Sequence, residues 1–252
     1  MKVGLSLSGG GARGIAHMGV LKGLEEIGVK PTMITGTSAG AIVGAFYCYG
    51  YSPDEFFEII KSTRLFRFIR PALTGKGLMH LSAVEDLFNK YFENDSFEAL
   101  KTPLVVASTD VKKGKSVYFY QGALIKAVMA SSAIPVIFNP IEMDDHLYID
   151  GGILNNLPVD PLVGHCDTLV GVSCNPVQDD FEMKNMKSLL ERSLLMAINV
   201  NTYQNRGKCD LFLEPEKLKK YGAFDFNKSE EIFEIGYHYV LNKKEQILQL
   251  AN

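Results

Sequence analysis

The stretch TMITGTSAGAIVGAF, at residues 32–46, decides the fold of this chain. Its beginning predicts a short strand, and its end begins an apolar helix. Between them, Gly36 and Gly40 flank Ser38 in the G-x-S-x-G pattern of a nucleophile elbow, a sharp strand-to-helix turn that exposes a serine hydroxyl. The N-terminus of the following helix offers free N–H groups to negative charge. The stretch predicts a serine nucleophile, with a glycine-rich turn around a structural serine as the alternative.

A second glycine cluster, GGGARG at residues 9–14, lies between a predicted strand and a predicted helix. Gly9, Gly11 and Gly14 match the G-x-G-x-x-G pattern of a dinucleotide-binding loop. That function needs an acidic residue at the end of the next strand to bind a ribose, and this chain has TGTS at residues 35–38 instead. A run of three glycines can also turn its N–H groups toward one point, which is the geometry of an oxyanion hole. The cluster therefore predicts an anion-stabilising loop, and a nucleotide-binding enzyme is the alternative.

The sequence offers few candidates for a catalytic base. Of the five histidines, His165 and His238 come late enough for a Ser-Asp-His order, and neither has the setting of a catalytic loop. Asp150 is the stronger candidate, because it ends a predicted strand and precedes Gly151 and Gly152. On such a turn its carboxylate can point into a cleft. The Asp-Gly pair fits an ordinary hairpin turn equally well, so both interpretations remain open at this point.

Taken together and in this order, these segments resemble the patatin-like phospholipase family. The resemblance rests on GGGARG at residues 9–14, GTSAG at 36–40 and DGG at 150–152, and it extends through ASSAIP at 130–135 and NNLPV at 155–159. It covers about residues 2–175. The resemblance implies an α/β fold of three layers, in which helices flank a mostly parallel central sheet.

The resemblance also implies a function: a lipid acyl hydrolase that cleaves carboxylic esters, of phospholipase A or lysophospholipase type, through an acyl-enzyme. Ser38 would be the nucleophile and Asp150 the base of a Ser–Asp dyad. The oxyanion hole would come from Gly10 and Gly11, with Gly9 allowing the turn. The supporting residues that the family pattern implies are Arg13, Gly14, Gly36, Gly40 and Gly151. The arginine would hold the loop or face an anionic head group.

The composition fits a soluble enzyme. The chain has 252 residues, of which 46% are apolar, and a net charge of −3, which gives no electrostatic reason to expect nucleic acid as a partner. Its four cysteines form no C-x-x-C pair and no metal-binding spacing, so we expect neither metal nor cofactor, and a reducing, cytoplasmic location. No signal peptide opens the chain, and the uncharged residues 34–51 divide into strand, turn and helix rather than a transmembrane segment. Basic and apolar residues mix at 61–70, which predicts a solvated helix or, as the alternative, a peripheral contact with a membrane surface.

The order of strand-like and helical segments predicts one domain over residues 1–252, because no repeat or linker divides the chain. The family motifs fill about residues 2–175, and about residues 180–252 complete the domain with helices and a strand at 210–213. Three functions stay under consideration: a lipid acyl hydrolase acting on a lipid or other acyl ester, a nucleotide-binding enzyme and a catalytically silent lipid-binding protein. The first accounts for both glycine turns and for Asp150. The residues predict no head group, acyl position or oligomeric state.

Overall fold

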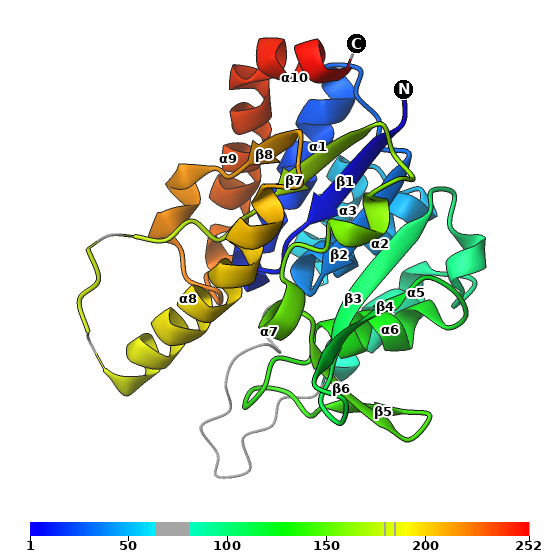
Figure 1. Cartoon of the computed structure of the whole chain (residues 1–252), viewed down its shortest axis with the longest axis vertical. Coiled ribbons are helices and arrows are strands. Elements are labelled where there is room, and N and C mark those ends of the chain that lie inside the picture. The colour runs from blue at the N-terminus through cyan, green and yellow to red at the C-terminus, as the bar shows by residue number, and fades with distance from the viewer. Residues whose placement is uncertain (64–80, 179, 184, 252) are drawn as a thin grey trace.

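The computed structural model describes the chain except for residues 64–80, 179, 184 and 252 (Figure 1). The segment from Arg64 to Arg70, for which the sequence leaves a membrane contact open, lies outside the described residues. Within the described part, no helix combines the length and the apolar character needed to cross a bilayer.

A sheet of eight strands forms the centre of the molecule. The strands are β1 Val3–Leu7, β2 Met33–Thr37, β3 Leu104–Asp110, β4 Lys115–Phe119, β5 Ile141–Met143, β6 His146–Asp150, β7 Thr168–Val172 and β8 Leu211–Leu213. Five of them run parallel in the order β3, β2, β1, β7, β8. Both β4 and β6 pair antiparallel with β3, and β5 pairs antiparallel with β6. The carboxyl ends of β1 and β2 therefore lie side by side, where open α/β sheets bind their ligands.

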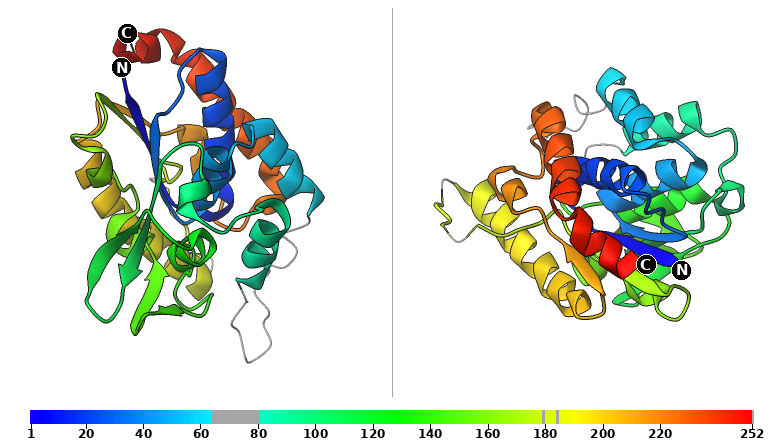
Figure 2. Two further views of the ribbon diagram at one scale, coloured as in Figure 1. Left: turned by 90° about the vertical axis from the view of Figure 1, so that its right-hand side faces the viewer. Right: turned by 90° about the horizontal axis from the view of Figure 1, so that it is seen from above.

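Helices cover both faces of the sheet and produce three layers (Figures 1 and 2). The helices are α1 Ala16–Glu26, α2 Ala39–Tyr49, α3 Pro53–Ser62, α5 Ser82–Tyr91, α6 Leu124–Ser131, α7 Gly152–Asn155, α8 Met186–Arg206, α9 Ser229–Asn242 and α10 Lys244–Ala251. On one side of the sheet lie α1, α2 and α6, with α9 packed against α1; on the other lie α7 and α8. The three-layer α/β fold expected from the sequence is thus confirmed.

Burial explains why the central strands read as apolar runs. The strands β1, β3 and β7 are buried along their whole length because helices cover both faces of the sheet. On the α2 side, Phe46 stacks on Phe56 with 3.9 Å between ring centroids and meets Phe92 edge-on. A smaller apolar cluster on the opposite side comprises Leu157, Val159, Leu162 and Leu169. These two cores hold the sheet from both faces.

One interpretation that the sequence left open is decided by the structure. Asp150 ends β6, and the residues after it form the short helix α7 rather than the second strand of a hairpin. The hairpin alternative for Asp150 is therefore wrong. The strand predicted at 210–213 is present as β8, which extends the parallel sheet beside β7.

Candidate active site

Ser38 lies at the sharp turn between β2 and α2, with φ 51° and ψ −120°. This backbone conformation is strained for a non-glycine residue, and such strain concentrates at functional sites. The flanking glycines permit the turn: a Cβ on Gly40 would lie 2.3 Å from Leu7 O, and one on Gly36 would lie 2.6 Å from Gly40 O. The local sequence therefore makes Ser38 project beyond the carboxyl end of β2.

A second serine, Ser131 at the end of α6, fixes the elbow from outside. Its hydroxyl accepts the N–H of Ser38 at 2.8 Å and donates to Ala107 O of β3 at 2.5 Å. Ser131 is fully buried, so these bonds are shielded from water. Sequence reasoning gave Ser131 no role, and the only signal for it was its place in the ASSAIP segment.

Strand register brings Asp150 to Ser38, although the two residues are far apart in the chain. Thr37 pairs with Ala107 of β3, and the next residue of β3, Ser108, pairs with Asp150 of β6. The side chains of Ser38 and Asp150 border the same cavity, and the Ser38 hydroxyl lies close enough to lower the pKa of the carboxyl. Both residues are more than nine-tenths buried. A hydroxyl and a carboxylate thus meet in a site from which water is largely excluded.

The environment of Asp150 makes it a stronger base than an ordinary aspartate. Burial raises the pKa of Asp150 to about 6, while hydrogen bonds from Ser38 and from the N–H of Gly152, at 2.7 Å, oppose part of that shift. An aspartate in water has a pKa near 4. With a pKa of about 6 the carboxylate remains mostly ionised at neutral pH and accepts a proton more readily.

The loop after β1 faces Ser38 with two unoccupied N–H groups. The N–H groups of Gly9 and Ala12 donate to main-chain carbonyls. Between them, the N–H groups of Gly10 and Gly11 have no acceptor among the described residues. All three glycines line a cavity that also contains Ser38. Gly9 therefore serves the turn, and the next two residues offer donors to a ligand.

The other glycines predicted to support the site lie where two segments touch. A Cβ on Gly14 would lie 2.4 Å from the Cβ of Ala39, and one on Gly151 would lie 2.3 Å from Ala107 O. The glycine loop thus packs directly on the start of α2, and the turn after Asp150 packs directly on β3. These close approaches bring all the predicted segments together around Ser38.

Helix α8 holds the segment after β6 with asparagine side chains that sequence reasoning missed. Asn201 accepts the N–H of Asn156 at 2.7 Å and donates to Gly152 O at 3.3 Å. Asn205 donates to the Asn155 side chain at 2.9 Å. The partners are 45 to 50 positions apart. The only sequence signal was a run of polar residues on one face of a long helical pattern.

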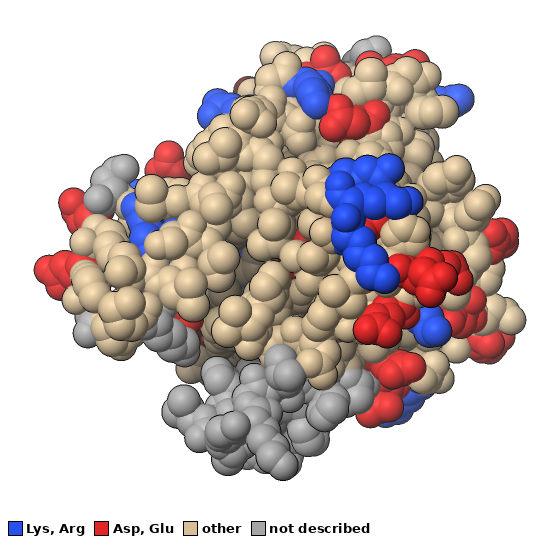
Figure 3. Space-filling view, turned by 60° about the horizontal axis from the view of Figure 1, so that its bottom comes forward, with Lys and Arg blue, Asp and Glu red and all other residues tan. Residues whose placement is uncertain are grey.

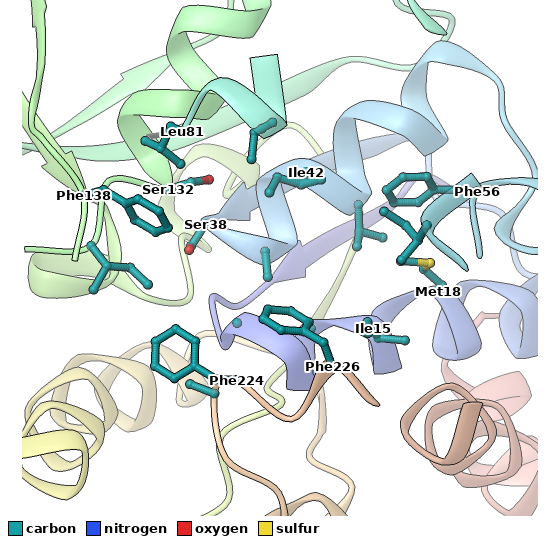
Figure 4. Close-up of a pocket in the computed structure, with 18 residues that line it drawn as sticks. Ile15, Met18, Ser38, Ile42, Phe56, Leu81, Ser132, Phe138, Phe224 and Phe226 are labelled. Carbon is teal, nitrogen blue, oxygen red and sulfur yellow. The ribbon is translucent and has the colours of Figure 1, made fainter. Parts of the chain in front are cut away.

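Two cavities meet at Ser38. The first runs from Ser38 and Ser132 at one end to Met18 and Phe56 at the other, and apolar side chains form nearly all of its lining (Figure 4). The second is bordered by the glycine loop and Asp150, and it also contains polar and charged side chains from η1 (Gly11–Ile15) and α8. The residues shared by both cavities are Gly11, Ser38, Ile134, Ala223 and Phe224. Ser38 therefore stands between an apolar cavity and a second, also largely apolar cavity that in addition holds charged side chains.

Arg13 supplies a positive charge to the second cavity. Its side chain borders that cavity and is only 6% exposed. Burial lowers the pKa of the guanidinium, and nearby acidic groups such as Asp225 oppose that shift. Glu191 borders the same cavity and is one of the acidic groups that act on Arg13, whose Nε has no hydrogen-bond partner among the described residues. A buried cation of this kind favours an anionic group nearby.

The histidines that the structure describes do not border the cavities at Ser38. His238 pairs with Glu234 on the surface of α9, and His165 is exposed. Over the described part of the chain, no group of three or more His, Cys, Asp and Glu side chains could hold a metal ion. Asp150 is therefore the candidate base that the geometry offers.

Fold and site together define an α/β protein with a serine on a nucleophile elbow and a buried carboxylate beside it. A family model described as patatin-like phospholipase matches residues 5–163, and the chain belongs to this family. The resemblance noted from the sequence is thereby confirmed.

Relatives extend the similarity beyond the range of the family model. An uncharacterized NTE family protein of Mycobacterium tuberculosis is 38% identical over 178 residues, which cover 69% of this chain and 49% of the relative. Lysophospholipase nte1 of Aspergillus fumigatus is 28% identical over 274 residues, which cover 94% of this chain and 18% of the relative. The chain thus spans about half, or less, of the length of these curated relatives.

A solved structure with a similar fold is VipD from Legionella pneumophila. The two match with a TM-score of 0.55 and 17% sequence identity, over 97% of this chain and 66% of VipD. This similarity concerns the fold alone, and it agrees with the three-layer architecture described above.

Proposed function

We propose that this protein is a lipid acyl hydrolase, a serine esterase that cleaves carboxylic esters of lipids. The observation that carries the proposal is the position of the Ser38 hydroxyl beside the buried Asp150, on one cavity and close enough to lower the pKa of that carboxyl. It lies where an apolar cavity meets a loop with unoccupied N–H groups. Membership of the patatin-like phospholipase family supports the same class of reaction.

The reaction would proceed through an acyl-enzyme. Asp150 takes the proton of Ser38 as Oγ attacks the ester carbonyl, and the carbonyl oxygen becomes an oxyanion. The N–H groups of Gly10 and Gly11 would stabilise that oxyanion, by about 3–4 kcal/mol for each donor. Asp150 then gives the proton to the leaving alcohol, and water releases the fatty acid by the reverse relay. Every proton in this cycle moves between Asp150 and an oxygen atom, so no cofactor takes part.

The apolar cavity suits the acyl chain of the substrate. No charged side chain lines it among the described residues, and Ser38 stands at one end of it (Figure 4). Each methylene that moves from water into such a cavity contributes about 0.8 kcal/mol. An acyl chain lying along Ile42 toward Phe56 would place its ester carbonyl at Ser38.

The second cavity suits the alcohol side of the substrate. Its buried Arg13 favours an anion there, and the phosphate of a phospholipid or lysophospholipid is the anion that such an ester carries. The name of the fungal relative, a lysophospholipase, fits this substrate class. Arg13 would thus select the head group, and the apolar cavity would select the chain.

The nucleotide-binding alternative is less well supported by the site. No acidic residue ends β2, and the first cavity, which Gly11 and Gly14 border, is lined almost entirely by apolar side chains. On the face seen in Figure 3, acidic and basic side chains are interspersed along one side, without a broad basic surface among the residues described there. The charges on that face therefore do not favour the binding of a polyanion such as nucleic acid.

A fluorophosphonate probe tests the proposal and separates it from a silent lipid-binding protein. We expect the probe to modify Ser38 in the unaltered chain and to leave Ser38→Ala unmodified, as read by mass spectrometry of peptides. Ser6→Ala is the matched control, because Ser6 is a buried serine of β1 whose hydroxyl has no partner. Asp150→Asn should abolish release of fatty acid from a lysophospholipid. Labelling that misses Ser38, or turnover that survives in Asp150→Asn, would contradict the proposal.

A further inference from the structure

Three buried side chains surround the carbonyl oxygen of Gly9, and the reaction scheme above uses none of them. Asn175, in the loop after β7, donates to this oxygen through Nδ2 at 2.5 Å. The hydroxyl of Ser8 donates to it at 2.9 Å, and Cys174 Sγ lies 3.6 Å away. All three side chains are at most 1% exposed. A carbonyl with donors converging on it is held in one direction.

The direction of this carbonyl determines where the next N–H points. In a planar trans peptide, the C=O of one residue and the N–H of the following residue point in opposite directions. Because the Gly9 carbonyl points toward Asn175 in the interior, the N–H of Gly10 points to the opposite side. There the loop borders the cavity of Ser38, and a Cβ built on Gly9 would lie only 3.2 Å from the Cβ of Ser38.

The side chain of Asn175 is oriented by this one contact. A main-chain carbonyl can only accept, so the amide nitrogen must face Gly9. The amide oxygen, Oδ1, is then buried without a partner. From α8, Asn199 donates to the main-chain carbonyl of Asn175 at 2.9 Å and steadies it. A buried amide whose oxygen has no partner destabilises the fold, because unsatisfied polar groups oppose folding. Stability alone therefore does not account for an asparagine at position 175.

We propose that Asn175 is a positioning residue for the oxyanion hole. It sets the plane of the peptide between Gly9 and Gly10, so that the Gly10 N–H faces the oxyanion that forms at Ser38. The effect of Asn175 on catalysis rests on the proposed acyl hydrolase function. Its effect on the orientation of the Gly9–Gly10 peptide does not depend on that function. Asn175 lies outside both cavities and acts only through the loop.

Labelling with glycine that carries 13C at the carbonyl and 15N at the amide isolates the peptides concerned. Only a glycine preceded by another glycine then has a labelled carbonyl bonded to a labelled amide. In this sequence those residues are Gly10, Gly11 and Gly152. An HNCO spectrum therefore reports the Gly9–Gly10 peptide directly, and Gly152, beside Asp150, serves as an internal reference.

Two variants of Asn175 are compared with one control. Asn175→Ala removes the donor, and Asn175→Asp keeps the size of the side chain but replaces the donor with a carboxylate oxygen. In both we expect the Gly10 signal to move in the carbonyl and amide dimensions while the Gly152 signal stays in place. Thr35→Val is the matched control, because it removes another buried side-chain donor, bonded to a main-chain carbonyl at 2.6 Å. It should leave the labelled signals where they are.

The same proteins are then assayed on a lysophospholipid. We expect the Asn175 variants to lose about 10- to 100-fold in kcat with KM changed less than about twofold, because an oxyanion hole acts on the transition state. Thr35→Val should keep both constants. A Gly10 signal that does not move in either variant overturns the proposal, and so does a moved signal with unchanged kcat. If the unaltered chain shows no turnover that depends on Ser38, the proposed function fails, and the spectra alone decide whether Asn175 orients the peptide.

Discussion

The half of the candidate site around Ser38, called the nucleophile half after its proposed role, and the half around Asp150, called the base half, are held in partly different ways. Around Ser38, Gly36 and Gly40 lie so close to main-chain atoms that a single added methyl would collide with backbone. Around Asp150, Gly151 packs just as closely on Ala107 O, and the segment up to Asn156 depends in addition on side-chain hydrogen bonds from α8. A methyl added at a close contact forces a whole segment to move, whereas the loss of one hydrogen bond costs only about 1 kcal/mol. We therefore expect substitutions at the close glycine approaches to be severe and those at the α8 asparagines to be moderate.

The largest effect should follow from Gly40→Ala. Its Cβ would lie 2.3 Å from Leu7 O, so α2 must shift and carry Ser38 away from Asp150. A displacement near 1 Å costs about 100-fold in rate, and we expect at least that loss in kcat/KM. Gly207→Ala is the matched control, because the nearest atom to its Cβ would be 3.8 Å away. Near-normal turnover in Gly40→Ala would show that the elbow is not held by close packing.

The nucleophile half could be predicted from the sequence because its causes are local. The glycines that permit the turn at Ser38 lie within two positions of it, and the strand and helix on either side are readable from their apolar pattern. The loop of Gly9 to Gly14 is local in the same sense. A pattern of a few residues therefore fixes each turn without knowledge of the rest of the fold.

The base half could be predicted only in part. The glycines after Asp150 allow two conformations, and the choice between them depends on β6 pairing antiparallel with β3, a contact between distant segments. The bonds from Asn201 depend on packing between elements that no short pattern encodes, and so does the bond from Ser131 to Ser38 in the other half of the site. Asparagine and serine are also common on solvated helices, so their types alone do not mark a buried role.

The pH dependence of the reaction tests the burial of the base. Asp150 must be ionised to accept the proton of Ser38, and burial raises its pKa to about 6. We expect kcat/KM for an uncharged short-chain ester to fall about tenfold for each pH unit below 6 and to level off above 7. The profile is measured in the unaltered chain between pH 4.5 and 8. A rate that stays constant down to pH 5 would mean that the carboxylate behaves like an ordinary, solvated aspartate.

The same burial predicts that Asp150 lowers the stability of the fold. Its pKa is about 6 in the folded chain and near 4 in the unfolded chain. Between those values the folded chain retains a proton that the unfolded chain has lost, so the free energy of unfolding falls as pH rises from 4 to 6. Above pH 6 the ionised carboxylate costs on the order of 2–3 kcal/mol.

Asp150→Asn should therefore be more stable than the unaltered chain at pH 7.5, by about that amount, with little difference at pH 4. Urea unfolding at both pH values measures the effect. Asp54→Asn is the control: this exposed aspartate pairs with Lys22 on the surface, and its loss should change stability by less than about 1 kcal/mol. If Asp150→Asn were less stable than the unaltered chain at pH 7.5, the ionised carboxylate would stabilise the fold. The idea that it is kept for catalysis at a cost in stability would then be wrong.

The smallest effect should come from Asn201→Ala, which tests the long-range half directly. The substitution removes the bonds to the Asn156 N–H and to Gly152 O, and the segment that carries Asp150 gains freedom. We expect kcat to fall about tenfold with a small change in KM, because the base is misplaced in the transition state. Gln204→Ala removes an exposed side chain of the same helix and should leave kcat unchanged. If Asn201→Ala lowered kcat as much as Gly40→Ala does, the base half would be held as rigidly as the elbow. If it lowered kcat as little as Gln204→Ala does, the contacts within β6 and α7 would be enough to hold Asp150.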